Sequence, residues 1–163
     1  MKPEIRKASL ADVKAITDIY NEAILTTTAT FDIQPKTLTS QKKWFQAHGN
    51  SNPVFVNIVG GDVVGWVSLS AYSDRCAYSG TAELSLYIKE SYRNQGIGKA
   101  LLSAVLVEGK KVGLHTVISR IAGDNDVSLH LHREFGFREI GVMNEVGRKF
   151  GKLLDVVLMQ KML

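Results

Sequence analysis

The sequence predicts an α/β fold in which a mixed, mostly antiparallel sheet is flanked by about four helices. Two observations lead to this prediction. Short segments of alternating or β-branched residues recur between segments with apolar residues at helical spacing, and a Gly-Gly-Asp turn joins two of the alternating segments. With 163 residues and a hydrophobic content of 45%, the chain is expected to form one domain over residues 1–163, with a sizeable core.

The first third of the chain is predicted to hold one strand and two helices. A strand is expected at residues 4–8, and Ser9 followed by Asp12 indicates the N-cap of the helix after it. Residues 26–39 are rich in Thr and are expected to form a loop, of the kind that often carries binding residues. A second, short helix is expected at 40–47.

The middle of the chain is predicted to be mainly strands. Residues 53–59 and 63–69 flank Gly60-Gly61-Asp62, which is a hairpin signal, so two antiparallel strands are expected there. Residues 81–88 alternate and are expected to form a third strand, which leads into a glycine-containing segment.

The last third is expected to begin with a helix that starts near Ile97 and stops at Gly113. After it the sequence predicts a strand at 115–121, a helix at 127–134, and two strands at 137–142 and 153–159 joined by a connection at 143–152.

The glycines Gly96 and Gly98 lie where the predicted strand gives way to this helix. Glycines let the backbone approach a ligand closely, and the free N–H groups of a first helical turn favour an anion such as pyrophosphate. A dinucleotide-binding fingerprint needs a third glycine where Leu101 stands. An NTPase phosphate loop needs glycine in place of Arg93 and Ser or Thr in place of Ala100, so both of these motifs are excluded.

The composition of the chain restricts the classes of partner that we expect it to bind. The formal charge of +4, with a pI near 9.2, is spread along the chain, which suits an anionic small molecule better than nucleic acid. The single cysteine, Cys76, excludes an intramolecular disulfide and a structural zinc site, so we expect no metal and a reducing, cytoplasmic location. No apolar run approaches the roughly 18 residues of a spanning helix, so no membrane partner is expected.

Two motifs resemble the signatures of the GNAT superfamily of N-acetyltransferases. The first is the Arg-x-x-Gly-x-Gly stretch from Arg93 to Gly98, and the second is Asn125-x-x-Ser128-x-x-Leu131-His132-x-x-x-Gly136-Phe137. The resemblance implies the GNAT fold and acetyl-CoA as cosubstrate. It also implies a set of residues that contact acetyl-CoA through the end of the strand, the glycine segment and the second motif: Leu86, Tyr87, Ile88, Arg93, Asn94, Gln95, Gly96, Ile97, Gly98, Lys99, Asn125 and Ser128.

The stretch Thr81-x-Glu83-x-Ser85-x-Tyr87 resembles the phosphinothricin N-acetyltransferase branch of this superfamily, whose glutamate is the proposed base. Strand parity places Glu83 on the face opposite Leu84 and Leu86, directed past the acetyl group, so we expect it to deprotonate the attacking amine. His132 stands where most relatives have Tyr, as in the phosphinothricin branch. It is a candidate acid for the departing thiolate, with a cofactor contact and a packing histidine as alternatives.

The resemblance implies a small amino-acid analogue as substrate: methionine sulfoximine, methionine sulfone or phosphinothricin, attacking the thioester directly. We expect seven side chains to hold it, namely Phe31, Arg75, Tyr78, Glu83, Ser85, Lys149 and Phe150. Members of this branch commonly form homodimers, which we expect here too. Two alternatives remain open: a GNAT enzyme that acetylates another amine, such as a protein N-terminus or an aminoglycoside, and an acyl-CoA-binding regulator without turnover.

Overall fold

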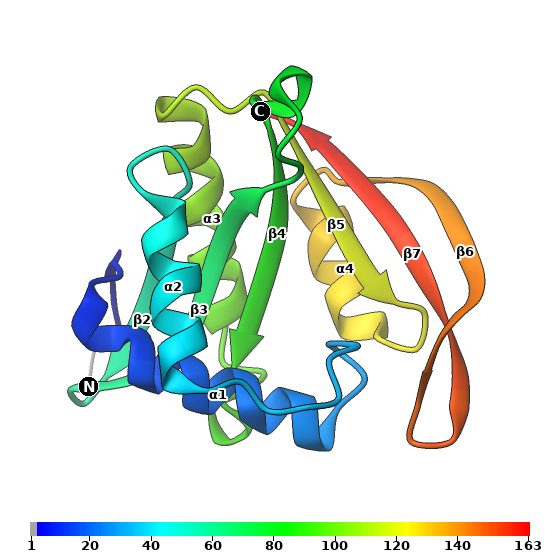
Figure 1. The fold of residues 1–163 in the computed structure, drawn as a ribbon, viewed down its shortest axis with the longest axis horizontal. Helices are drawn as coiled ribbons and strands as arrows, with labels where there is room; N and C mark the ends of the chain where they lie inside the picture. The colour runs from blue at the N-terminus through cyan, green and yellow to red at the C-terminus, as the bar shows by residue number, and fades with distance from the viewer. Residues whose placement is uncertain (1–2) are drawn as a thin grey trace.

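A computed structural model describes residues 3–163, and a seven-stranded sheet runs through them in the order β1-β2-β3-β4-β5-β7-β6 (Figure 1). Strands β4 and β5 pair in parallel, and the other neighbouring strands pair antiparallel. The strands are β1 (Glu4–Lys7), β2 (Val54–Val59), β3 (Asp62–Ala71), β4 (Thr81–Ile88), β5 (Thr116–Ala122), β6 (Arg138–Lys149) and β7 (Lys152–Met162). The predicted mixed, mostly antiparallel sheet is confirmed.

Four α-helices flank this sheet, as predicted: α1 (Val13–Thr26), α2 (Leu38–His48), α3 (Ile97–Lys111) and α4 (Asp126–Glu134). Helices α1 and α2 lie on one face, and α3 and α4 lie on the other (Figure 1). Short 3-10 helices precede α1, follow β3 and precede α3. Among residues 3–163, none of the helices is long and apolar enough to cross a membrane.

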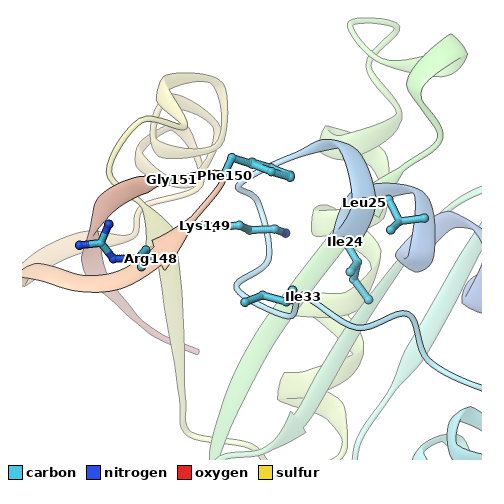
Figure 2. A pocket seen from close by; sticks show the side chains of 7 residues that line it. All are labelled: Ile24, Leu25, Ile33, Arg148, Lys149, Phe150 and Gly151. Atoms are coloured by element: carbon cyan, nitrogen blue, oxygen red, sulfur yellow. The ribbon is translucent and has the colours of Figure 1, made fainter.

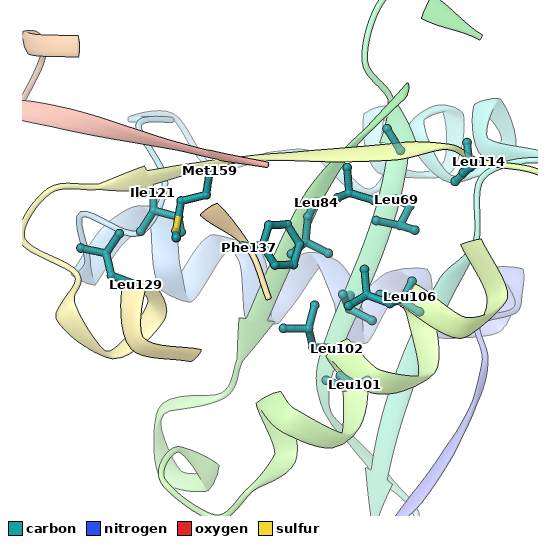
Figure 3. Close-up of a cluster of buried hydrophobic side chains, with 14 of the residues drawn as sticks. Leu69, Leu84, Leu101, Leu102, Leu106, Leu114, Ile121, Leu129, Phe137 and Met159 are labelled. Atoms are coloured by element: carbon teal, nitrogen blue, oxygen red, sulfur yellow. The ribbon is translucent and has the colours of Figure 1, made fainter. Parts of the chain in front are cut away.

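The larger part of the core lies between the sheet and α3 (Figure 3). The predicted apolar stripe of α3 is buried, with Leu101, Leu102 and Val105 fully inaccessible to solvent. Gly65 of β3 explains how closely α3 can approach, since a Cβ at that position would lie 3.2 Å from a methyl carbon of Leu101. The smaller core on the opposite face packs α1 against Trp66 and its neighbours.

The prediction for the C-terminal part of the chain is wrong in one respect. Residues 143–152, expected to be a connection, are mostly strand, because β6 continues to Lys149 and turns into β7 through Phe150 and Gly151. The pairing of β6 with β7 is irregular between Met143 and Gly147, and Glu145 has a φ of 50°. This irregularity breaks the two-residue alternation that identifies a strand in a sequence.

Candidate active site

The candidate site begins where the parallel strands β4 and β5 separate. Their ladder pairs only Thr81 with Thr116, Ala82 with Val117 and Glu83 with Ile118. Beyond Glu83 the strands diverge (Figure 1), and a small hollow of about 50 Å³ lies between residues 84–87 of β4 and 119–122 of β5. We call it the interstrand hollow. Backbone groups of β4 that face it do not pair with β5, so they are available to a ligand.

Glu83 lies at the last paired position of this ladder. Residues Leu84 and Leu86 pack into the core on the α3 side, whereas Tyr87 packs on the α1 side with Trp66, so the predicted strand parity is confirmed. Glu83 therefore faces the side of the sheet that α1 and α2 cover. Its side chain is 30% exposed, and its Oε1 lies 3.6 Å from Nε of Arg120, an ion pair that the sequence did not predict.

A groove of about 410 Å³ adjoins the interstrand hollow, and we call it the cofactor groove. Seven residues that were predicted to contact acetyl-CoA line it: Leu86, Tyr87, Ile88, Arg93, Asn94, Asn125 and Ser128. The loop after α1 forms part of its wall, where the hydroxyl of Thr28 donates to both carboxylate oxygens of Asp124 at 2.9 and 3.0 Å. The sequence did not predict that Thr28 and Asp124 meet across this groove.

The two glycines before and within the first turn of α3 have different physical roles. Gly96 is the N-cap residue and has a φ of 80°, which favours glycine. Gly98 is buried, and a Cβ there would lie 3.3 Å from side-chain carbons of both Ile88 and Leu131. Close packing beneath the helix thus gives a reason for Gly98 that the sequence did not suggest, beside the predicted approach of a ligand to its backbone.

Arg93 is held at the edge of the cofactor groove by a hydrogen bond from its Nε to the carbonyl oxygen of Ile88, at 3.2 Å. The terminal nitrogens of its guanidinium are then free to meet an anion. Other predicted contacts point elsewhere: Gln95 donates to the carbonyl of Ser91 at 3.2 Å, and Lys99 pairs with Glu134 at 2.7 Å.

Asn125 lines both the cofactor groove and the interstrand hollow. Its Oδ1 caps α4 by accepting from the backbone N–H of Ser128 at 3.1 Å. Its Nδ2 can donate to a ligand at the same time, so capping and the predicted pantetheine contact are compatible.

His132 lines the interstrand hollow and is only 3% exposed. Its Nδ1 lies 2.7 Å from the carbonyl oxygen of Ser128. A carbonyl oxygen only accepts, so Nδ1 carries the proton and Nε2 carries a lone pair. Burial lowers the pKa of the imidazole, which keeps the ring neutral at physiological pH.

Ser119 of β5 is a feature that the sequence did not predict. It is 1% exposed, lines the interstrand hollow, and its hydroxyl has no hydrogen-bond partner among the residues that the structure describes. An unpartnered buried hydroxyl is costly, so it indicates a group that awaits a polar ligand. The sequence held one signal for it: Ser119 is the polar residue at a core-facing position of this strand, between Val117 and Ile121, which are both buried.

The structure separates three predicted substrate residues from the interstrand hollow. Phe31 packs on Gly147, where an added Cβ would lie 2.3 Å from the ring, and Lys149 is buried with its Nζ donating to the carbonyl of Thr30 at 2.7 Å. Lys149 and Phe150 line a separate pocket near the tip of the β6–β7 hairpin (Figure 2). Within one chain, Lys149 is therefore not free to pair with a substrate carboxylate, which corrects the prediction.

Desolvation lowers the pKa of the Lys149 ammonium, in keeping with this buried position. Arg75 and Tyr78 lie on the exposed segment between β3 and β4, where Tyr78 meets Tyr72 edge-on with ring centroids 5.3 Å apart. Arg75 is exposed and does not line the interstrand hollow, so its pairing with a substrate carboxylate stays a prediction.

This arrangement, a divided pair of parallel strands beside a helix start suited to anions, defines a class of acyl-group transferases that take a thioester donor. The chain belongs to the acetyltransferase (GNAT) family, whose model matches residues 16–137. It is 36% identical to the L-methionine sulfoximine/L-methionine sulfone acetyltransferase of Pseudomonas paraeruginosa, over 98% of this chain and 94% of the relative.

Two solved structures share the fold over nearly the whole chain. One is a phosphinothricin acetyltransferase from Sinorhizobium meliloti in complex with acetyl-CoA, with a TM-score of 0.95 and 36% identity, covering 100% of this chain and 89% of that one. The other is a ribosomal-protein-alanine N-acetyltransferase from Brucella melitensis, with a TM-score of 0.94 and 35% identity, covering 98% and 99%.

Proposed function

We propose that the protein transfers the acetyl group of acetyl-CoA to the α-amino group of small amino-acid analogues, namely methionine sulfoximine, methionine sulfone and phosphinothricin. The observation that carries this proposal is the end of the β4–β5 ladder at Glu83, one residue before Leu84, where the lining of the interstrand hollow begins. The names of the relatives support the choice of substrates.

Glu83 serves as the general base in this proposal. The amine is an ammonium in neutral water, so its proton must leave before it can attack the thioester. Glu83 faces the α1–α2 side of the sheet, from which a small substrate can reach the interstrand hollow past Ser85. The amine then attacks the thioester directly, and the backbone N–H groups of residues 84–87 are candidates to stabilise the developing negative charge.

The residues of the cofactor groove fit acetyl-CoA. Arg93 and the first turn of α3 supply positive charge and free N–H groups for the pyrophosphate, while Asn125 and the unpaired edge of β4 supply donors and acceptors for the pantetheine amides. His132 accepts a hydrogen bond at Nε2 from an N–H of the pantetheine arm, because the thioester itself has no donor. Because its neutral ring presents a lone pair there, we assign it a cofactor contact in preference to an acid.

The test is release of free CoA thiol from acetyl-CoA with a panel of amines. We expect methionine sulfoximine and methionine sulfone to give the highest kcat/KM, phosphinothricin a lower one, and an aminoglycoside little turnover. A peptide with N-terminal alanine covers the alternative suggested by the Brucella melitensis structure, and preference for it would replace our substrate assignment. A regulator without turnover would bind acetyl-CoA and release no thiol with any amine.

We also propose a cytoplasmic homodimer, for which β6 offers the surface. This strand lies at the edge of the sheet, where unpaired backbone groups invite a partner. Large apolar side chains on β6 and on the turn and strand that follow are about half exposed: Ile140, Val142, Val146, Phe150 and Leu153. Exposed apolar groups gathered in this way are typical of an interface. A reducing compartment suits the exposed thiol of Cys76.

A further inference from the structure

A second hollow lies on the face that α1 and α2 cover, and we call it the aromatic hollow. Its volume is about 350 Å³. Ser85 lines both this hollow and the interstrand hollow, so the two are neighbours along β4. None of the residues that the sequence predicted to hold a substrate lines it except Ser85.

Four aromatic rings form the apolar wall of the aromatic hollow. Trp66 of β3 and Tyr87 of β4 are cross-strand partners with ring centroids 5.1 Å apart. Tyr20 of α1 stands 5.0 Å from Tyr87, and Trp44 of α2 stands 5.4 Å from Trp66, both edge-on. Rings packed on one another in this way form a rigid wall, which suits a compact apolar group such as a methyl.

This wall contains a hydrogen-bond donor without an acceptor. Trp66 is 2% exposed, and its Nε1–H has no partner among residues 3–163. A buried N–H that stays unpaired costs free energy that a ligand with a suitably placed acceptor recovers. Gln41 of α2, which is 6% exposed, also lines the hollow and brings two further donors on its amide.

The one carboxylate of the hollow, Asp32, is already occupied. The hydroxyl of Tyr20 donates to it, and Nζ of Lys36 lies 3.2 Å from its Oδ2. Asp32 is therefore not a free counter-ion for a substrate ammonium. Lys36 also lines the hollow, so the two charges form a neutral pair, and among the described residues that line it no free cation is left to meet an anionic head group.

We infer that the aromatic hollow binds the uncharged oxide head group of the amino-acid substrate. Trp66 Nε1–H donates to an oxygen of the sulfone or sulfoximine, and the rings enclose its terminal methyl. The inference rests on the proposed function and adds a selectivity to it: a neutral sulfone or sulfoximine is preferred to an anionic phosphinate, because the ammonium of Lys36 is already paired with Asp32.

The spacing along β4 agrees with this placement. Tyr87 and Ser85 are two residues apart, or about 7 Å along a strand. Four single bonds separate the sulfur of methionine sulfone from its amino nitrogen, which is roughly 5 Å when extended. A head group against Trp66 and Tyr87 therefore puts the amine at the level of Ser85, beside Glu83 and the interstrand hollow.

The experiment compares kcat/KM for methionine sulfone with that for methionine, which has the same stem and no oxide oxygens. In the wild-type protein we expect the sulfone to be the better substrate. Trp66→Phe keeps a ring and removes the N–H, so the ratio of the two kcat/KM values should fall about tenfold. Gln41→Met, which keeps the volume, should lower the same ratio and serves as the second variant if Trp66→Phe folds poorly.

Trp44→Phe is the matched control, because it removes the other indole N–H of the same wall. If Trp66 is the donor to the oxide, Trp44→Phe should change both substrates by the same factor. An unchanged ratio in folded Trp66→Phe or Gln41→Met protein would overturn the head-group assignment while leaving the proposed function intact. A wild-type protein that acetylates no amino-acid analogue would instead refute the proposed function, and this inference with it.

A further variant tests the selectivity against anionic head groups. Asp32→Asn removes the negative charge at the hollow, so kcat/KM for phosphinothricin should rise relative to that for methionine sulfone. A ratio that stays constant or falls would show that Asp32 does not select against anionic head groups, and would overturn that part of the inference.

Discussion

At the scale of single residues, one hydrogen bond fixes which ring nitrogen of His132 carries the proton. The acid that the sequence allowed would need a proton on the nitrogen that faces the thioester. Because Nδ1 donates to Ser128 and burial disfavours a second proton, Nε2 can only accept. This hydrogen bond argues against the acid and leaves the cofactor contact and the packing histidine as the roles to be tested. No sequence pattern reports which atom of a neighbouring turn the ring meets.

The buried, neutral His132 also predicts how stability depends on pH. Its pKa is lowered in the folded protein, so the unfolded chain binds the proton more readily, with a pKa near 6.5. The contribution of His132 to stability is present above that value and is lost as pH falls below it, by at most about 1.4 kcal/mol per pH unit.

We therefore expect His132→Phe to lose less stability than wild type between pH 7 and pH 5. Urea unfolding at several pH values measures this. The control is His130→Phe, an exposed position on the same helix, which should follow the wild-type pH dependence. A His132→Phe profile parallel to wild type would contradict the neutral, buried state of the ring.

Glu83→Gln tests the base. The amide keeps the shape of the side chain and cannot accept the proton, so we expect kcat to fall roughly 10²-fold or more at neutral pH. The loss should shrink as pH rises and free amine becomes available, while the affinity for acetyl-CoA stays unchanged. Steady-state kinetics from pH 6 to 9 measure this, with the exposed Glu90→Gln as control. An unaltered pH–rate profile would assign the base to another group.

At the scale of elements, the sequence predicted the order of strands and helices and the place of the glycine segment. These features depend on local periodicity and turn residues, which a sequence contains. Both strands of the β6–β7 hairpin were predicted, but their full length was missed because the irregular pairing near Glu145 hides the alternation. The packing at Gly98 was also missed, since it depends on Leu131, which α4 brings from 33 residues away to lie under α3.

Gly98→Val should therefore act on stability as well as on binding. The added methyl groups enter the space of Ile88 and Leu131, so we expect a loss of about 1–3 kcal/mol in the free energy of unfolding and, as the start of α3 shifts, weaker binding of acetyl-CoA. Denaturant unfolding and calorimetry measure the two effects. Arg93→Ala is the contrasting variant, expected to weaken binding with little loss of stability. Wild-type stability in Gly98→Val would argue against tight packing at this position.

At the scale of the whole molecule, what the sequence could not predict are contacts between distant segments. Lys149 meets Thr30 across 119 residues, and this contact turns a predicted substrate ligand into a structural tie between the hairpin and the loop after α1. The aromatic hollow likewise exists only because α1 and α2 dock on β3 and β4. Spacing within one element gives no information about such encounters.

The homodimer is tested at this scale. Sedimentation velocity at micromolar concentration should give the mass of a dimer. Val146→Glu adds a charge to the exposed apolar side of β6, and we expect it to give monomers with an unchanged fold, as judged by circular dichroism. The same change at the exposed Val107 of α3, on the other side of the molecule from β6, is the control. A wild-type monomer would refute the proposed dimer.

The short β4–β5 ladder makes the sheet an assembly of two parts. Three residue pairs form the seam between the four strands on one side and the three on the other. The cofactor groove takes residues from both sides of that seam, Leu86 and Arg93 from one and Asn125 and Ser128 from the other. We expect a bound acyl donor to pair with the free edge of β4 where β5 has diverged, and so to slow amide hydrogen exchange at residues 84–87. On this expectation the donor bridges β4 and β5 where their own pairing stops, and release of the product removes that bridge in each turnover.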